Sequence, residues 1–348
     1  MEYQQRLLKE GVKLHTFVIA EVGVNHNGSI ETAKKLVDIA LKAGCDAIKF
    51  QTFKAEKIVT RQAKKAEYQI RNTSDLESQY EMLKVLELSQ ECHLELIKYC
   101  KCNEITFLST PFDEESSDFL ESIGLKMFKI PSGEITNKPL IQHIAKKQKP
   151  IILSTGMSTL GEVEEALEWI YEEGNTQITL LHCTSNYPTI PEDVNLRAMI
   201  TLKQAFNIKV GYSDHTLGIE IPLAAVALGA TIIEKHITLS KEMEGPDHKA
   251  SLEPYELIEM VSKIRNLEKA LGDGLKRPTI KEYETRTLAR KSIVAVRDIS
   301  TSEVINIDML TCKRPGSGLA PKYIDMIVGK IAKRSISADE QIDLTDVY

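Results

Sequence analysis

The chain has 348 residues, with 44 lysines and arginines against 50 aspartates and glutamates, and a formal net charge of −6. This is an ordinary soluble composition, and the absence of a basic stripe excludes a typical nucleic-acid-binding protein. The longest apolar stretch, residues 221–233, is broken by Pro222 and Gly229 and is too short to span a bilayer. The polar first 13 residues have no signal-peptide core, and the six scattered cysteines form no C-x-x-C pair. We therefore expect a cytoplasmic protein with reduced thiols that binds neither nucleic acid nor membrane.

From residue 17 onward, short β-rich segments alternate with amphipathic helices. In the first helix, residues 29–44, apolar side chains recur at spacings of three and four, and Gly44 suits the C-terminal cap. The strands are predicted at 17–22, 47–51, 105–109, 127–130, 150–154, 178–183, 209–213 and 231–236. Helices are predicted at 29–44, 76–103, 113–124, 139–147, 159–174, 192–206, 219–229 and 254–271. Eight such units are the number that closes a (β/α)8 TIM barrel.

Two regions depart from this alternation. The polar insert after the second strand, residues 52–75, is predicted to be a loop, and a loop of that length is usually functional. After the eighth unit, a turn-rich segment and a charged segment lead into short strand and turn units. The sequence thus predicts a TIM-barrel catalytic domain over 1–275, a linker over 276–290, and a small β-rich domain over 291–348. A domain of about 60 residues is marginally stable alone, so we expect it to pack on the barrel or on another subunit.

Strands seven and eight bring two histidines to the end of the predicted barrel where active sites lie. Because side chains alternate along a strand, His215 shares a face with Ser213, and His236 shares a face with Glu234. Asp214 and Lys235, which stand between the members of these pairs, point to the opposite face of their strands. Two neighbouring imidazoles would make half of a transition-metal site. An isolated strand-end histidine is more commonly a structural residue, so the metal interpretation depends on the other strand ends.

Strands two and four carry inward-facing lysines, Lys49 and Lys129, which are costly to bury unless they meet a partner or a ligand. Together with hydroxyl groups at the neighbouring strand ends, they predict a pocket for phosphate or carboxylate oxygens. An anion pocket beside a Lewis acid suits carbon–carbon bond formation between an anionic enol donor and an aldehyde. The hydroxyls are those of Thr110, Ser132 and Ser154, and the candidate acid–base groups are Glu21, Glu134 and Glu234.

Motifs along nearly the whole chain resemble the sialic acid synthase family. Those in the barrel are Ala20-Glu21-Val22-Gly23-Val24-Asn25-His26-Asn27-Gly28, Lys49-Phe50-Gln51, Ser109-Thr110-Pro111-Phe112, Lys129-Ile130-Pro131-Ser132-Gly133-Glu134, Ser154-Thr155-Gly156-Met157, Tyr212-Ser213-Asp214-His215, Glu234-Lys235-His236 and Gly245-Pro246-Asp247-His248. Residues 292–295 and 313–316 resemble the C-terminal antifreeze-like (SAF) domain of that family.

The resemblance implies an enzyme that condenses phosphoenolpyruvate with an N-acylated mannose-type sugar and releases phosphate by C–O cleavage. It implies a divalent metal on His215 and His236, Mn²⁺ first, with Mg²⁺ or Co²⁺ as alternatives. The implied catalytic groups are Glu21, Glu134, His215 and His236. The implied phosphoenolpyruvate contacts are Lys49, Thr110, Lys129, Ser132, Ser154, Ser185 and Ser213. The implied sugar contacts are Gln51, Tyr187, Asp247 and Arg314.

Three points about the site stay open at this stage. Some family members have Asn at the position of Ser185, whereas here the Asn is at 186, so either residue could contact phosphate. Either Glu21 or Glu134 could handle the water. The resemblance also implies that Arg314 reaches the sugar in the barrel of a neighbouring subunit, and hence a homodimer with swapped C-terminal domains.

Alternatives to this function remain. N-acetylneuraminate synthase, which uses N-acetylmannosamine, is the first expectation, and N,N′-diacetyllegionaminate synthase, which uses 2,4-diacetamido-2,4,6-trideoxymannose, is the alternative. A metal-dependent TIM-barrel hydrolase would need a third ligand, for which His26 and His248 are candidates, while His182 is a more natural core residue. A non-enzymatic ice- or partner-binding role for the small domain is the remaining possibility.

Overall fold

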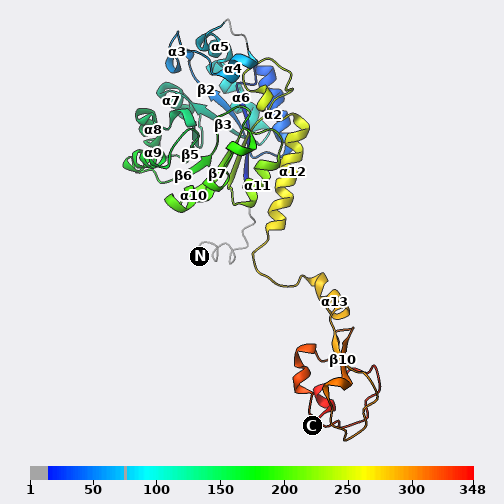
Figure 1. Cartoon of the computed structure of the whole chain (residues 1–348). Helices are drawn as coiled ribbons and strands as arrows, with labels where there is room; N and C mark the ends of the chain where they lie inside the picture. Colours follow the sequence, from blue (N-terminus) through cyan, green and yellow to red (C-terminus); the bar gives the residue numbers. More distant parts are fainter. Residues whose placement is uncertain (1–14, 74–76) are drawn as a thin grey trace. The chain divides into compact units, whose positions relative to one another are not determined.

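The computed structural model describes residues 15–73 and 77–348. Residues 1–14, expected to contain no signal-peptide core, and 74–76, which span the boundary between the predicted insert and the next predicted helix, lie outside the described residues. The chain divides into two compact units, Met1–Asp273 and Gly274–Tyr348. Each unit is described by itself (Figure 1).

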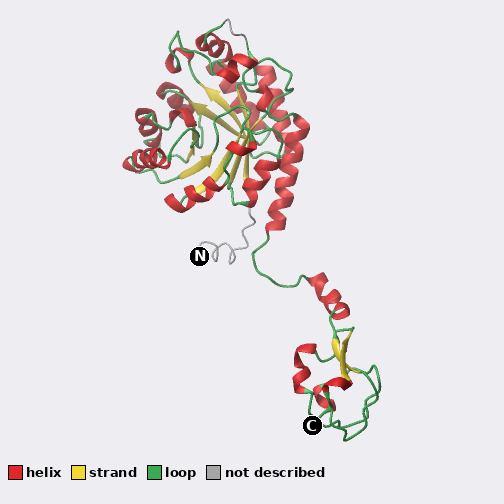
Figure 2. Cartoon of the chain, viewed as in Figure 1, coloured by secondary structure: helices red, strands yellow, loops and turns green. Residues whose placement is uncertain are grey.

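The first unit is an eight-stranded parallel barrel surrounded by helices (Figures 1 and 2). The order of strands is β3-β2-β1-β8-β7-β6-β5-β4, and β3 and β4 lie side by side, which completes the ring. The predicted TIM barrel is therefore confirmed. The strands are β1 (Phe17–Gly23), β2 (Ala47–Thr52), β3 (Thr106–Pro111), β4 (Phe128–Ile130), β5 (Ile151–Ser154), β6 (Ile178–His182), β7 (Lys209–Asp214) and β8 (Ile232–His236).

The strands are nearly continuous apolar runs because both of their faces are buried, one inside the barrel and one beneath the helices. The first helix, α2, begins after Ser29, whose side chain accepts a hydrogen bond from Thr32 N, and it ends at Gly44, which has a φ of 77°. The barrel helices are α2 (Ile30–Ala43), α5 (Gln79–Leu86), α6 (Gln90–Cys102), α7 (Glu114–Ser122), α8 (Lys138–Ala145), α9 (Leu160–Glu172), α10 (Arg197–Phe206), α11 (Glu220–Ala227) and α12 (Pro254–Leu271).

The insert predicted as a loop over 52–75 contains two short helices, α3 (Ala55–Ile58) and α4 (Glu67–Asn72). That part of the prediction was wrong because α4 buries none of its residues, so it shows no apolar period to read. Its first turn is closed locally instead, since Ala66 N donates to Gln69 Oε1 at 2.9 Å.

A fully buried ion pair joins β7 and β8 on the side away from the barrel interior, as strand alternation predicts. Asp214 and Lys235 are opposite each other in the register of the two strands, and both are 0% exposed. Lys235 Nζ donates to Asp214 and, at 2.5 Å, to the carbonyl of Thr216. Because the pair fixes the register directly before both strand ends, it fixes where His215 and His236 emerge.

The second unit is small and has its own core. Its helix α13 (Ile280–Ala289) lies within the segment predicted to be a linker, and all its residues are exposed. Strands β9 (Ser292–Ala295) and β10 (Leu310–Lys313) pair antiparallel. A cluster that includes Ile293, Ile305 and Ile342 fills the interior.

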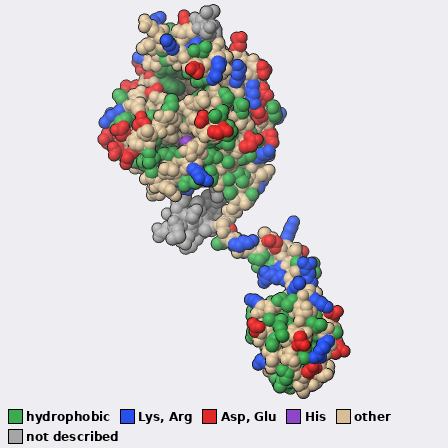
Figure 3. Space-filling view, viewed as in Figure 1, with side chains coloured by type: hydrophobic (Ala, Val, Ile, Leu, Met, Phe, Trp, Pro, Cys, Tyr) green, Lys and Arg blue, Asp and Glu red, His purple; other side chains and the backbone are tan. Residues whose placement is uncertain are grey.

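The surface adds two findings about the described residues. Among them, no helix combines the length and apolar character needed to cross a membrane. On the face of the barrel drawn in Figure 3, acidic and basic side chains are interspersed.

The buried pair between β7 and β8 makes the first prediction. Lys235→Met leaves Asp214 as an uncompensated buried charge, so the free energy of unfolding of the barrel should fall by about 3–5 kcal/mol. Adding Asp214→Leu should restore most of this loss, because an apolar pair needs no compensation. Urea unfolding followed by the fluorescence of Trp169, the only tryptophan, reports on the barrel.

The matched control is Lys263→Met, which removes a half-exposed lysine paired with Glu259 at 2.6 Å. Water screens that ion pair, so a much smaller fall in the free energy of unfolding is expected. If Lys235→Met is as stable as this control, the buried pair does not stabilise the barrel in the way proposed.

Candidate active site

A buried charge cluster occupies the carboxyl ends of the strands. Lys49 Nζ, on β2, donates to Thr110 Oγ1 at 2.8 Å, forms an ion pair with Glu21, and lies 3.7 Å from Glu234 Oε2. Lys129 Nζ, on β4, donates to Glu234 Oε1 at 2.9 Å. All five side chains are buried. The two lysines that the sequence predicts as an anion pocket thus face each other across glutamates.

Ser213 completes this cluster, since its Oγ donates to the same oxygen of Glu234 at 2.9 Å. Burial raises the pKa of Glu21 to about 7, even beside Lys49. Burial also acts against ionised Glu234, but Lys129 and Lys49 outweigh it and hold the pKa of Glu234 below its usual range. The result is one carboxylate that stays ionised and a second that exchanges a proton near neutral pH.

A second group of hydroxyls surrounds Gly156, two residues after the end of β5. Gly156 N donates to Ser132 Oγ at 2.9 Å, and Ser132 Oγ lies 3.1 Å from Cys183 Sγ. A Cβ at position 156 would lie 2.3 Å from Ser185 Oγ and 2.8 Å from Ser132 Oγ. Ser154 Oγ is buried nearby in sequence and has no hydrogen-bond partner. The missing side chain of Gly156 therefore lets Ser132, Cys183 and Ser185 approach its backbone closely. This group, here called the Gly156 cluster, offers hydroxyl donors that suit phosphate oxygens.

The position of the strand-six serine bears on the choice between Ser185 and Asn186. Ser185 Oγ lies against Gly156, within the Gly156 cluster. Asn186 is exposed, and its carbonyl accepts a hydrogen bond from Thr189 Oγ1 at 2.7 Å. The geometry favours Ser185, and not Asn186, as the side chain in this cluster.

The two strand-end histidines are neighbours, with ring centroids 5.5 Å apart. His215 Nδ1 donates to the carbonyl of Thr184 at 2.8 Å, which leaves Nε2 free to bind a ligand. His236 Nδ1 is buried without a hydrogen-bond partner and lies 4.0 Å from Asp247 Oδ2. Burial lowers the pKa of His215 to about 4 and that of His236 well below its usual range. Both imidazoles are neutral at pH 7, so this pair fits a divalent metal with open coordination positions.

Further predicted residues meet around the histidines. The Tyr187 ring lies 4.1 Å from that of His215. A Cβ at Gly23, which has a φ of +57°, would lie 3.2 Å from Glu21 Oε1, 3.2 Å from His236 Cε1 and 3.3 Å from Gln51 Nε2. The backbone turn at Gly23 thus allows the side chains from β1, β2 and β8 to converge.

Two predicted residues have hydrogen-bond partners close to them in the fold. Glu134 Oε2 accepts a hydrogen bond from Asn137 Nδ2 at 2.6 Å, one turn further on. Arg314 belongs to the second unit, where its Nε donates to the carbonyl of Ala289 at 2.9 Å.

The candidate third metal ligands have structural partners. His26 Nδ1 accepts from Gly28 N at 2.9 Å, and His248 contacts Thr238 Oγ1 at 2.6 Å and Asn27 Oδ1 at 3.2 Å. His182 Nε2 donates to the carbonyl of Val194 at 2.7 Å. Among the described residues, no group of three or more His, Cys, Asp or Glu side chains is arranged to hold a metal. The three-ligand site that a hydrolase would require is therefore not found in that part of the chain.

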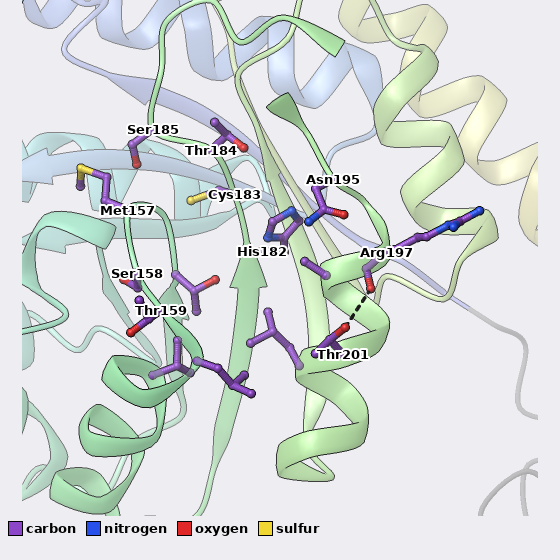
Figure 4. A pocket seen from close by; sticks show the side chains of 15 residues that line it. Met157, Ser158, Thr159, His182, Cys183, Thr184, Ser185, Asn195, Arg197 and Thr201 are labelled. Carbon is purple, nitrogen blue, oxygen red and sulfur yellow. Dashed lines mark hydrogen bonds between the residues drawn. The ribbon is translucent and has the colours of Figure 1, made fainter. Parts of the chain in front are cut away.

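A cavity of about 580 Å³ lies beside the site, bordered by the ends of β5 and β6 and by α9 and α10 (Figure 4). It shares Cys183 and Ser185 with the Gly156 cluster. Its polar lining is partly satisfied within the protein, for example where Thr201 Oγ1 donates to the carbonyl of Arg197 (Figure 4).

Sequence reasoning missed several partners. It listed Glu234 among the acid–base candidates but did not identify it as the acceptor shared by Lys129 and Ser213. It also missed Tyr68, whose ring stacks on Tyr187 with centroids 5.1 Å apart. The position of Glu234, two residues before His236, gave a usable signal, because alternation puts both on the inner face. Tyr68 lies in the insert, where residues 65–69 resemble both candidate synthases, but that resemblance did not place its ring against Tyr187.

A TIM barrel with buried charges and neutral histidines at its carboxyl end has the architecture of an enzyme. The NeuB family model matches residues 36–276, and the SAF domain model matches residues 290–347. The chain therefore belongs to the NeuB family, and the predicted resemblance is confirmed.

Individual relatives cover almost the whole chain. N,N′-diacetyllegionaminic acid synthase of Campylobacter jejuni is 53% identical over 94% of this chain and 98% of its own. The enzyme of the same name from Legionella pneumophila is 49% identical over 94% and 93%. A crystal structure of N-acetylneuraminic acid (sialic acid) synthetase from Leptospira borgpetersenii matches with a TM-score of 0.69 and 36% identity, over 78% of this chain and 90% of that one.

His26 provides a test of burial without metal binding. Burial lowers its pKa to about 3, so the unfolded chain takes up a proton first as the pH falls below about 6.5. The stabilisation that accompanies a neutral His26 is present above that pH and is lost toward pH 4. His26→Asn should be less stable than the parent at pH 7. The difference in free energy of unfolding between the parent and this variant should shrink by about 1.4 kcal/mol per pH unit below pH 6.5.

Urea unfolding between pH 7 and 4, followed by Trp169 fluorescence, measures this difference. Mn²⁺ binding by His26→Asn should equal that of the parent, whereas His236→Asn should lose it. A constant deficit across the pH range, or a loss of Mn²⁺ binding in His26→Asn, would contradict this role for His26.

Proposed function

We propose that this chain is a nonulosonic acid synthase that condenses phosphoenolpyruvate with an N-acylated mannose-type sugar. The observation that carries the proposal is the buried cluster of Lys49 and Lys129 beside the neutral pair His215 and His236. The relatives named as synthases of such acids support it.

For the acceptor, we propose 2,4-diacetamido-2,4,6-trideoxymannose, with N,N′-diacetyllegionaminate as the product. The sequence motifs alone favoured N-acetylmannosamine and kept this sugar as the alternative. The two legionaminic acid synthases at 53% and 49% identity shift the preference.

The donor phosphoenolpyruvate is assigned to the charge cluster and to the Gly156 cluster. Its carboxylate would bind Lys49 and Thr110, which already contact each other at 2.8 Å. Its phosphate would take Lys129 together with the hydroxyls around Gly156 and on β7, because these supply a point charge and several donors. The hydroxyls are Ser132, Ser154, Ser185 and Ser213.

The metal is assigned to His215 and His236, with Mn²⁺ preferred and Mg²⁺ or Co²⁺ as alternatives. Bound there, it would supply Lewis-acid polarisation of the sugar aldehyde. Thr184 supports this assignment, because its carbonyl fixes the tautomer of His215 that leaves Nε2 available.

The sugar is assigned to the space beside the histidines. Gln51 and Tyr187 border it and Asp247 lies behind His236. C3 of phosphoenolpyruvate attacks the aldehyde carbon, water adds at C2, and phosphate leaves with cleavage of its C–O bond. Of the two glutamates considered for the water, we favour Glu21, because burial brings its pKa to about 7, where a general base works best at neutral pH.

We further propose a homodimer in which the second unit of one subunit completes the site of the other through Arg314. Helix α13 supports this proposal. Its apolar side chains Ile280, Tyr283 and Leu288 are exposed, as is typical of a surface that binds another protein chain.

We place the reaction in the cytoplasm. All six cysteines are free thiols, as expected for a reducing compartment.

A panel of acceptors tests the function. The protein is incubated with phosphoenolpyruvate, Mn²⁺ and each sugar, and phosphate release is measured. The 2,4-diacetamido sugar should give the highest kcat/KM, and N-acetylmannosamine a lower value. His215→Ala, His236→Ala or a chelator should abolish turnover, and phosphate formed in ¹⁸O-water should carry no label. Labelled phosphate, or full activity in chelated buffer, would refute the mechanism.

The Gly156 cluster gives a further prediction. Gly156→Ala places a methyl group among Ser132 and Ser185, so the KM for phosphoenolpyruvate should rise about ten- to a hundredfold while the KM for the sugar changes little. The control is Gly161→Ala in α9, where an added Cβ meets nothing within 4 Å. Equal effects of the two substitutions would remove the phosphate assignment.

The exchange of the second unit is tested by mixing two inactive variants, Arg314→Ala and His236→Ala. If Arg314 acts on the partner's barrel, a random mixture regains about a quarter of the parent activity, because half of the dimers carry one intact site. If each subunit uses its own Arg314, the mixture stays inactive.

A further inference from the structure

Helix α4, in the insert after β2, packs against residues assigned to the sugar. Asn72 Nδ2, at the end of α4, donates to the carbonyl of Pro246 at 2.8 Å, one residue before Asp247. Lys65, just before α4, is buried and reaches Glu77 Oε1 and Thr73 Oγ1, both at 3.1 Å. The short helix is therefore held at both ends, and it is joined to the loop that carries Asp247.

This attachment puts the ring of Tyr68 at the end of a row of three rings. Tyr68 stacks on Tyr187 with centroids 5.1 Å apart and an angle of 24°. Tyr187 in turn lies 4.1 Å from His215. Burial and the nearby carboxylate of Asp247 raise the pKa of the Tyr68 phenol, so the hydroxyl stays protonated and can donate. The row leads from the insert to the metal-binding histidines.

We propose that Tyr68 contacts the acceptor sugar and contributes to the choice between acceptors. The assignment rests on the proposed function, and it adds a residue from the insert to the sugar subsite. Tyr68 offers a ring face and a hydroxyl donor, the two features that recognise an uncharged sugar bearing acyl groups.

The two candidate acceptors differ in the groups such a ring recognises. The 2,4-diacetamido-2,4,6-trideoxy sugar carries a C6 methyl and a second acetamido methyl, where N-acetylmannosamine carries hydroxyls. Burying these methyl groups against an aromatic face is favourable, whereas burying hydroxyls is not. Tyr68 therefore favours the less polar acceptor.

The experiment measures steady-state kinetics of the full-length protein with both acceptors. Tyr68→Ala should raise the KM for the 2,4-diacetamido sugar about tenfold or more. The KM for N-acetylmannosamine should rise less, and the KM for phosphoenolpyruvate should stay within about twofold. Tyr68→Phe keeps the ring and should retain most of the preference. Mn²⁺ binding, measured without substrates, should be unchanged in both variants.

The matched control is Tyr80→Ala, which removes a tyrosine of α5 that contacts Arg61 and not the ring row. Its kinetics should equal those of the parent. If Tyr68→Ala melts below assay temperature, Tyr68→Leu gives the same comparison with more apolar bulk. Unchanged sugar KM values, or an equal rise for phosphoenolpyruvate, overturn the assignment. No turnover of either sugar by the parent overturns the proposed function itself, and this assignment with it.

Discussion

The arrangement of the site depends on the balance of charge inside the barrel. The buried charges of Lys49 and Lys129 are compensated by Glu21 and Glu234, which lie against them. An anionic donor that enters must take over these lysines, so its oxygens compete with the carboxylates already in place. Glu234 keeps a second hydrogen bond from Ser213, whereas burial raises the pKa of Glu21 to about 7, so the environment favours its ionised form less. Glu21 is thus the carboxylate that gives up its ion pair with a lysine most easily when the donor binds.

A second constraint sets the metal half of the site. The buried pair of Asp214 and Lys235 fixes the register of β7 and β8 from outside the barrel, and His215 and His236 follow those residues directly. Inside, Ser213 and Glu234 are hydrogen-bonded one residue earlier. The same two strands are therefore tied on both faces, by a salt bridge outside and a hydrogen bond inside. This places the imidazoles side by side without relying on a bound ion.

The predictability of each part follows from these constraints. Strand alternation was enough to place His215, His236 and the inward lysines, because a strand has only two faces. It predicted equally that Asp214 and Lys235 point away, but not that they pair with each other. Pairing depends on the register between strands, which a single sequence does not encode. The contact between Tyr68 and Tyr187 was beyond reach, since α4 buries none of its residues and shows no apolar period.

The two halves of the site differ in how they are built, and this bears on specificity. The residues assigned to the donor stand mainly on or directly after strands, which are held on both sides by hydrogen bonds. The residues assigned to the sugar come mainly from connections, among them Tyr187 after β6 and Asp247 after β8, with α4 packed against them. Connections tolerate substitution and insertion better than barrel strands do. One barrel can therefore keep a fixed donor chemistry while the loops over its mouth adapt to different sugars.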